Sequence, residues 1–221
     1  MALIEPREPP TTRNAAKTRQ RILDAAEGVF AARGLEGTRM AAIASSAGCN
    51  QALLYHYFAS KDQLFTAVLE QTYAKIRNAE QQLELDHLQP KAAIQKLVEF
   101  SFDYVHANPS FIKLINEENL HGAEHLKLSS GARQLNTPLV ATLAKILDEG
   151  ATNGDFRQGV DPVQLYITIA SIAYFFTANR ATLSVIFELP HVEATLTKRR
   201  THIVEVILGY LREPDANGVL A

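Results

Sequence analysis

Side chains of the kinds that contact nucleic acid are concentrated between residues 50 and 61. The amide of Gln51 can pair bidentately with adenine, and Ala52 and Leu53 can offer apolar contact to a thymine methyl. Hydroxyl, imidazole and ammonium groups further along can hold phosphates without reading sequence. The candidate DNA-binding residues are Arg39, Asn50, Gln51, Ala52, Leu53, Tyr55, His56, Tyr57 and Lys61. They predict a chain that binds double-stranded DNA.

A second pattern, H-G-A-E-H at residues 121–125, matches the H-x-x-E-H sequence of some zinc peptidases. There, two histidines one turn apart share a helix face with a general base. A zinc-dependent hydrolase using His121, Glu124 and His125 is therefore an open alternative. Gly122 inside the ligand helix and the lack of a fixed third ligand argue against it. We expect no catalytic residue, no metal and no cofactor.

The DNA-binding candidates require two short helices that meet at Gly48. Thr38 is the expected N-cap of the first helix. Gly48 can take the left-handed conformation of a tight turn, and Asn50 can then cap the second helix. Leu54 and Phe58, at i and i+4, face inward on that helix. In a helix-turn-helix the second helix lies in the major groove.

The remaining chain favours an all-α fold, because helix formers dominate and alternating β-branched runs are lacking. Proline-rich residues 1–14 read as a disordered arm, followed by a helix-turn-helix domain at 15–61 and a helical effector-binding and dimerisation domain at 62–221. The 62–84 helix joins the two domains without Pro or Gly. We expect further helices at 15–33, 90–107, 109–119, around 139–147, at 162–188 and at 192–211, with 121–130 ambiguous.

Residues 18–64 resemble the DNA-binding domain of the TetR/AcrR family of bacterial transcriptional regulators. The chain departs from the usual Val-Ser at Cys49-Asn50, and from the frequent Gly or Pro followed by Thr at Ala52-Leu53; both departures bear on the operator sequence. The resemblance implies phosphate contacts by Tyr55 and Lys61. The matching residues are Thr18, Ile22, Leu23, Ala25, Ala26, Phe30, Gly34, Thr38, Ile43, Ala44, Ala47, Gly48, Leu54, Tyr55, Tyr57, Phe58, Ser60, Lys61 and Leu64.

The resemblance also implies a homodimer in which two C-terminal helices of each copy form a four-helix bundle. The 162–188 helix is apolar on more than one face, as burial against both its own core and a partner requires. A fully internal helix is the alternative. The candidate interface residues are Tyr166, Ala170, Ala173, Val206 and Tyr210.

Members of the family usually bind a small-molecule effector inside the C-terminal helices. Such pockets are mostly apolar and contain a few placed polar groups. The candidate effector-binding residues are polar or aromatic and lie on inward faces: Tyr104, Asn116, Glu117, His121, Tyr174, Phe175 and Asn179.

The charge distribution agrees with a DNA-binding N-terminal part. The net charge of −2 divides into +3 over residues 1–61 and −5 over residues 62–221, and binding depends on the local basic face. The most apolar stretch, 163–187, is too polar for a membrane span, and no signal peptide is evident. A single cysteine, Cys49, allows no internal disulfide. We expect a cytoplasmic protein without membrane contact.

These observations together predict a dimeric transcriptional repressor that a small molecule releases from a palindromic operator by shifting the 62–84 helix. An activator of the same fold is the nearest alternative.

Overall fold

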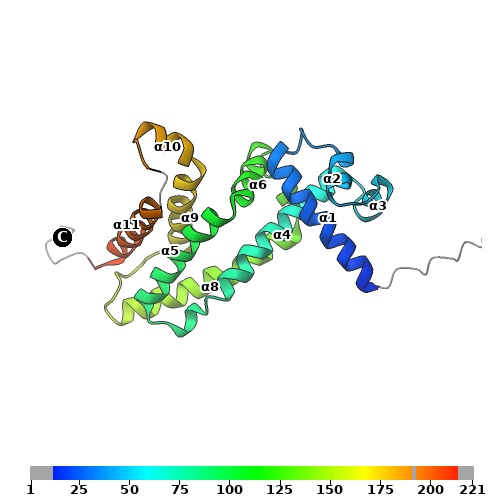
Figure 1. The fold of residues 1–221 in the computed structure, drawn as a ribbon. Coiled ribbons are helices and arrows are strands. Elements are labelled where there is room, and N and C mark those ends of the chain that lie inside the picture. Colours follow the sequence, from blue (N-terminus) through cyan, green and yellow to red (C-terminus); the bar gives the residue numbers. More distant parts are fainter. Residues whose placement is uncertain (1–11, 191–192, 214–221) are drawn as a thin grey trace, which may run out of the picture. The chain divides into compact units, whose positions relative to one another are not determined.

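The computed structural model describes residues 12–190 and 193–213, and this part of the chain forms eleven α-helices, one short 3-10 helix and no strand (Figure 1). The all-α prediction is confirmed. The elements are α1 Thr12–Arg33, α2 Met40–Ser46, α3 Gln51–Tyr57, α4 Lys61–Gln81, η1 Leu85–His87, α5 Pro90–Ala107, α6 Pro109–Leu120, α7 Glu124–Leu128, α8 Ser130–Thr152, α9 Pro162–Ala178, α10 Arg180–Ile186 and α11 Glu193–Leu211.

The helices are divided between two compact units. Among the described residues, the first unit contains 12–71 and 113–129, and the second contains 72–112 and the chain from 130 onward. The first unit is thus larger than the domain predicted at 15–61. Most of the predicted arm, residues 1–11, lies outside the described residues, and α1 already begins at Thr12.

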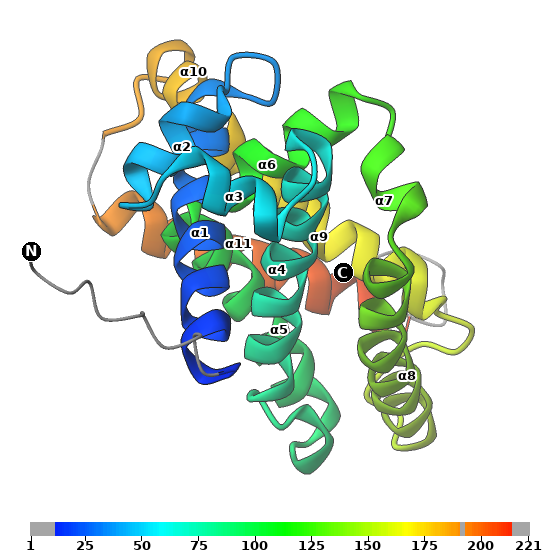
Figure 2. The same cartoon turned by 90° about the vertical axis from the view of Figure 1, so that its right-hand side faces the viewer.

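The core of the first unit is built from α1 to α4 and completed by α6. Phe30 of α1 and Phe65 of α4 meet edge to face, with ring centroids 5.1 Å apart. Ile43 of α2 and Leu54 of α3 are fully buried in the same cluster, and so is Leu114 of α6. Figure 2 shows α1, α2 and α3 packed together. Each such side chain stabilises the fold by about 1.5–3 kcal/mol, so residues distant in sequence hold the helix-turn-helix in place.

In the second unit α5 is the central helix. It packs against α8, α9, α11 and η1, because Ile94, Leu97 and Val98 recur at helical spacing and are all buried. Phe102 of α5 contacts Phe176 of α9, with ring centroids 6.0 Å apart. The periodic apolar positions of α5 therefore organise this unit.

The helix predicted over 162–188 is broken in two. Asp161 caps α9, and its carboxylate accepts hydrogen bonds from the backbone N–H groups of Val163 and Gln164. The α9 helix ends at Ala178, and α10 leaves at an angle of 68°. The Asn179 side chain donates to the Phe175 carbonyl oxygen at 2.9 Å, and a side chain that hydrogen-bonds the local backbone in this way competes with the helix.

The segment 121–130, which the sequence left ambiguous, contains the short helix α7. The helix expected around 139–147 begins earlier than predicted, at Ser130. Across residues 12–190 and 193–213, no single helix is long and apolar enough to cross a membrane; only α9 and α10 taken together, across their bend, meet the length and composition required.

Candidate nucleic-acid interface

The turn between α2 and α3 has the conformation that the sequence predicted. Gly48 has a φ of +62°, a value that glycine adopts at little cost. The backbone N–H of Cys49 donates to the Ala44 carbonyl oxygen at 3.0 Å, closing the end of α2. Gly48 thus lets α2 end and α3 begin within four residues.

The two predicted N-caps have different outcomes. Asn50 caps α3, because its Oδ1 accepts a hydrogen bond of 2.7 Å from the Leu53 N–H. The prediction for Thr38 was wrong: Arg39 occupies the N-cap position of α2 without a side-chain cap. The Thr38 hydroxyl instead donates to the Gly34 carbonyl oxygen at 2.6 Å. Its side chain therefore stabilises the loop between α1 and α2.

The start of α3 presents the side chains expected to read bases. Gln51 and Ala52 are exposed, and Leu53 is half-buried. On the opposite side Leu54 and Phe58 are buried in the core, as predicted. The remaining candidates divide by exposure: Arg39, Asn50, Tyr55 and His56 are exposed, and Tyr57 and Lys61 are half-buried.

Lys61 has a structural contact in addition to its predicted role. Its ammonium group donates to the Leu35 carbonyl oxygen at 2.8 Å, joining the start of α4 to the loop between α1 and α2. An ammonium group has three N–H donors, so this bond leaves room for a phosphate contact. Substitution of Lys61 would change the loop as well as the charge.

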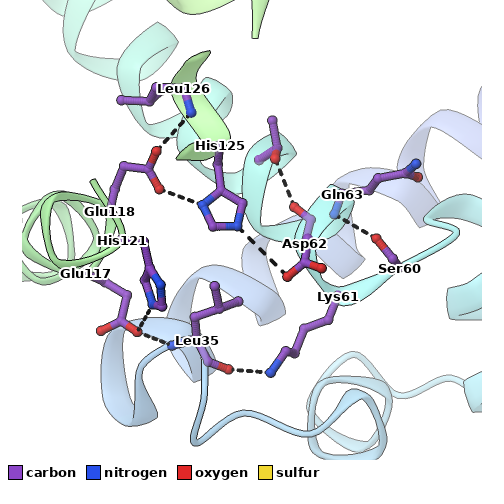
Figure 3. A network of polar contacts seen from close by, with 11 residues as sticks. Leu35, Ser60, Lys61, Asp62, Gln63, Glu117, Glu118, His121, His125 and Leu126 are labelled. Carbon is purple, nitrogen blue, oxygen red and sulfur yellow. Dashed lines mark hydrogen bonds and ion pairs between the residues drawn. The ribbon is translucent and has the colours of Figure 1, made fainter. Parts of the chain in front are cut away.

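A polar network that the sequence did not predict joins α6 and α7 to the start of α4 and to the loop between α1 and α2 (Figure 3). Glu118 is buried, and its carboxylate contacts His125 Nδ1 at 2.7 Å and accepts a hydrogen bond from the Leu126 N–H at 2.9 Å. His125 Nε2 lies 3.9 Å from a carboxylate oxygen of Asp62 in the first turn of α4. The adjacent Glu117 accepts a hydrogen bond of 2.6 Å from the Leu35 N–H.

The predicted effector-binding residues do not lie in one unit. Glu117 belongs to the first unit, where it contacts His121 at 3.5 Å in addition to Leu35. Asn116 also belongs to the first unit, and the rest of the set, Tyr104, Tyr174, Phe175 and Asn179, belongs to the second. The i,i+4 spacing of Glu117 and His121 was a signal for their contact. No pattern in the sequence indicated the contacts that Glu117 and Glu118 make with other elements.

The H-G-A-E-H segment does not form the helical turn that the zinc alternative requires. Gly122 and Ala123 both have positive φ values, 64° and 60°. The chain is therefore not helical between the end of α6 at Leu120 and the start of α7 at Glu124. His125 uses Nδ1 to contact Glu118. Within residues 12–190 and 193–213, no group of three His, Cys, Asp or Glu side chains is placed to hold a metal ion.

The candidate interface residues, all in the second unit, differ in how far they are exposed. Ala173 is only 1% exposed within its own unit, so its inclusion was wrong: a buried methyl group cannot meet a second copy. The Tyr166 hydroxyl accepts a hydrogen bond from Arg77 of the same chain. Ala170 is half-buried. Val206 and Tyr210 on α11 are 43% and 45% exposed.

The exposed face of α9 contains apolar residues that were not predicted as interface. Val163 and Ile167 are 44% and 48% exposed. Together with Ala170 they follow the i, i+4, i+7 spacing of one helix face. Only their exposure in the tertiary structure distinguishes them from the apolar residues of α9 that fill the core.

Comparison with protein families matches both parts of the chain. Residues 22–68 match the family described as "Bacterial regulatory proteins, tetR family". Residues 90–207, more than half of the chain, match "Tetracyclin repressor-like, C-terminal domain".

Individual relatives agree with these matches. NicS of Pseudomonas putida, an HTH-type transcriptional repressor, is 39% identical over 170 residues, which cover 77% of this chain and 80% of NicS. KstR2 of Rhodococcus jostii, also named a transcriptional repressor, is 26% identical over 93% of this chain and 98% of its own. Among solved structures, SCO4942 of Streptomyces coelicolor has a TM-score of 0.68 and 26% identity, covering 89% of this chain and 99% of its own.

Proposed function

Because this chain belongs to the TetR family of bacterial transcriptional regulators, we propose that it represses transcription by binding a palindromic operator as a homodimer, and that a small-molecule effector releases it. The observation that carries the proposal is the exposed first turn of α3, where Gln51 and Ala52 stand above a buried Leu54. A helix that is buried on one side and exposed on the other can enter the major groove. Because bacterial operator DNA lies in the cytoplasm, the protein would act there.

The proposed DNA contacts are of two kinds. Gln51, Ala52 and Leu53 contact base edges, and Tyr55, His56 and Lys61 contact phosphates, with Arg39, Asn50 and Tyr57 as neighbouring candidates. Phosphate contacts position the protein and supply salt-dependent affinity, and base contacts supply specificity. The Asn50 cap supports this division, because it fixes the first turn of α3 whose side chains would read the bases.

The proposed dimer uses the apolar faces of α9 and α11. Val163, Ile167, Val206 and Tyr210 are large side chains exposed by 43% to 48%, and contiguous exposed apolar surface marks interaction sites. A second copy would bury them symmetrically in an isologous interface. Two recognition helices could then reach half-sites about 34–36 Å apart.

The proposed release acts through α4, which contributes Lys61–Gln71 to the first unit and continues into the second. It contains neither Pro nor Gly, so a displacement of its second half is not absorbed by a kink. An effector with a hundredfold preference for the DNA-free state supplies about 2.7 kcal/mol, enough to vacate an operator. Operator DNA must weaken effector binding by the same factor.

The test is a footprint of the purified protein on the DNA flanking its own gene, combined with a reporter fused to the protected promoter. We expect a protected palindrome and higher reporter activity when the gene is deleted. Lower activity on deletion would instead show an activator of the same fold. The absence of a sequence-specific footprint, with the protein folded and dimeric, would contradict operator binding in the tested region.

A further inference from the structure

A cavity of about 420 Å³ lies in the second unit between the α9–α10 pair and α11. Its size falls within the range of small-molecule sites, roughly 300–1,000 Å³. Phe176, Leu183 and Leu189 contribute apolar wall, and α11 contributes Lys198, Arg199 and His202. No carboxylate lines it in the described part of the chain. The cavity is therefore apolar with positive charge along one side.

Arg199 is the most informative residue of this cavity. Its guanidinium lies 5.6 Å from the centre of the Phe176 ring, and its Nε is buried without a hydrogen-bond partner among the described residues. Partial burial lowers the pKa of the guanidinium. The next residue, Arg200, differs because it pairs with Asp103 at 3.0 Å and Glu99 at 3.2 Å.

Burying a guanidinium N–H donor without a hydrogen-bond partner costs free energy. A bound anion would offset this cost by accepting charge-assisted hydrogen bonds. An aromatic or alkyl group beside that anion would cover the exposed apolar wall. A neutral apolar molecule would leave the Arg199 Nε unpaired, and a small inorganic anion would leave the wall in water. The lining thus selects a molecule that combines both parts.

We propose that this cavity binds a small amphiphilic anion, whose carboxylate or sulfonate group contacts Arg199 and Lys198 and whose aromatic or alkyl body packs on Phe176, Leu183 and Leu189. The proposal rests on the proposed function only in assigning this molecule to the class of effectors. Binding to the cavity is measured with the protein alone, without DNA.

The test uses two fluorescent probes with closely similar ring systems, anilinonaphthalene sulfonate and the uncharged phenylnaphthylamine, titrated into the full-length protein. Arg199→Gln and Lys198→Gln are each expected to weaken binding of the sulfonate roughly tenfold or more, with little change for the neutral probe. Arg200→Gln is the matched control, because it removes the same charge from the same helix outside the cavity. Arg199→Lys, which keeps the charge, should restore part of the affinity.

Equal sulfonate affinity in the wild type and both glutamine variants would overturn the proposal, and so would an equal loss for the two probes. Light scattering at the protein concentrations used in the titrations shows whether the protein is a monomer or a dimer. Sulfonate binding that disappears as a dimer forms would also overturn it, because a second copy would then fill the cavity. Should a variant fail to fold, a shift of the wild-type Arg199 Nε–H resonance on adding the sulfonate supports the proposal, and no shift contradicts it. Operator binding, measured separately, tests the proposed function alone.

Discussion

His125 Nδ1 lies 2.7 Å from the Glu118 carboxylate, and both residues are buried in the first unit. The His125 ring also packs edge to face on Phe65 of α4, with centroids 4.9 Å apart. The α7 helix, which contains His125, therefore packs against α4 within the first unit although the two helices are far apart in sequence. We expect the stability of this unit to depend on the contact.

Glu118→Ala should lower the free energy of unfolding by about 2–3 kcal/mol, because it removes a charged hydrogen-bond acceptor from His125 and from the Leu126 N–H. Glu124→Ala, at an exposed position nearby, is the control and should change stability by less than about 0.5 kcal/mol. Denaturant titration followed by circular dichroism measures both. Equal effects of the two substitutions would show that the Glu118 contact contributes little.

Gly34→Ala should destabilise the protein by more than about 1 kcal/mol. Gly34 has a φ of +70°, and an added Cβ would lie 3.0 Å from the Glu117 carboxylate oxygens, so the substitution strains the backbone and crowds the contact to Leu35. Gly28→Ala in α1 meets nothing within 4 Å and should stabilise by about 0.5–1 kcal/mol. Thermal unfolding of the two variants should shift in opposite directions, and a shift in the same direction would contradict the structural reason.

Gln51→Ala should relax the preference at one base pair, with a loss of about 1–3 kcal/mol of binding free energy on the cognate site only. Lys61→Ala should weaken binding to all DNA sequences about equally. It should also reduce the slope of the logarithm of the binding constant against the logarithm of the salt concentration by about 0.9. Titrations on operator and shuffled DNA at several salt concentrations measure both effects. Because Lys61 also bonds to the Leu35 carbonyl, its variant is compared at a temperature where unfolding data show it folded. Equal loss of discrimination in the two variants would contradict these roles.

Val206→Asp should produce a folded monomer, because Val206 is 43% exposed on α11 and a charge there opposes burial against a second copy. Ala173→Asp should instead unfold the second unit, because that position is in the core. Ala141→Asp, at an exposed position of α8, is the control and should stay dimeric. Light scattering and circular dichroism together distinguish the three results. A dimeric Val206→Asp variant would show that the dimer interface does not include Val206.

Burial raises the pKa of Glu80 to about 7 from its ordinary 4.5, against the opposing effect of Arg77. A raised pKa in the folded state means that this group's contribution to stability is present below pH 4.5 and is lost as the pH rises through about 7. Glu80→Gln should remove this loss. Between about pH 5 and about pH 8 the stability of the wild type should fall relative to the variant by on the order of 1–3 kcal/mol. Identical pH dependence of the two proteins would contradict the shift, and exposed Glu84→Gln is the control.

Local patterns in the sequence determined most of the helices and the geometry of the turn. The glycine at position 48, the Asn50 cap and the inward pair Leu54 and Phe58 depend on contacts within a few residues along the chain. Such contacts follow from helical periodicity and backbone preference, so the start of α3 was predictable before any tertiary structure was known.

Contacts between distant segments were decided only by the tertiary structure. The Leu35 backbone N–H donates to the Glu117 carboxylate, 82 residues along the chain. Ala173 of α9 is core, and Val206 of α11 is surface. Apolar residues on every side of a helix read alike in sequence, and only the packing of neighbouring helices determines which of them are exposed. The same holds for Glu118, because a carboxylate has many possible partners along a chain and folding brings only a few of them within hydrogen-bond distance.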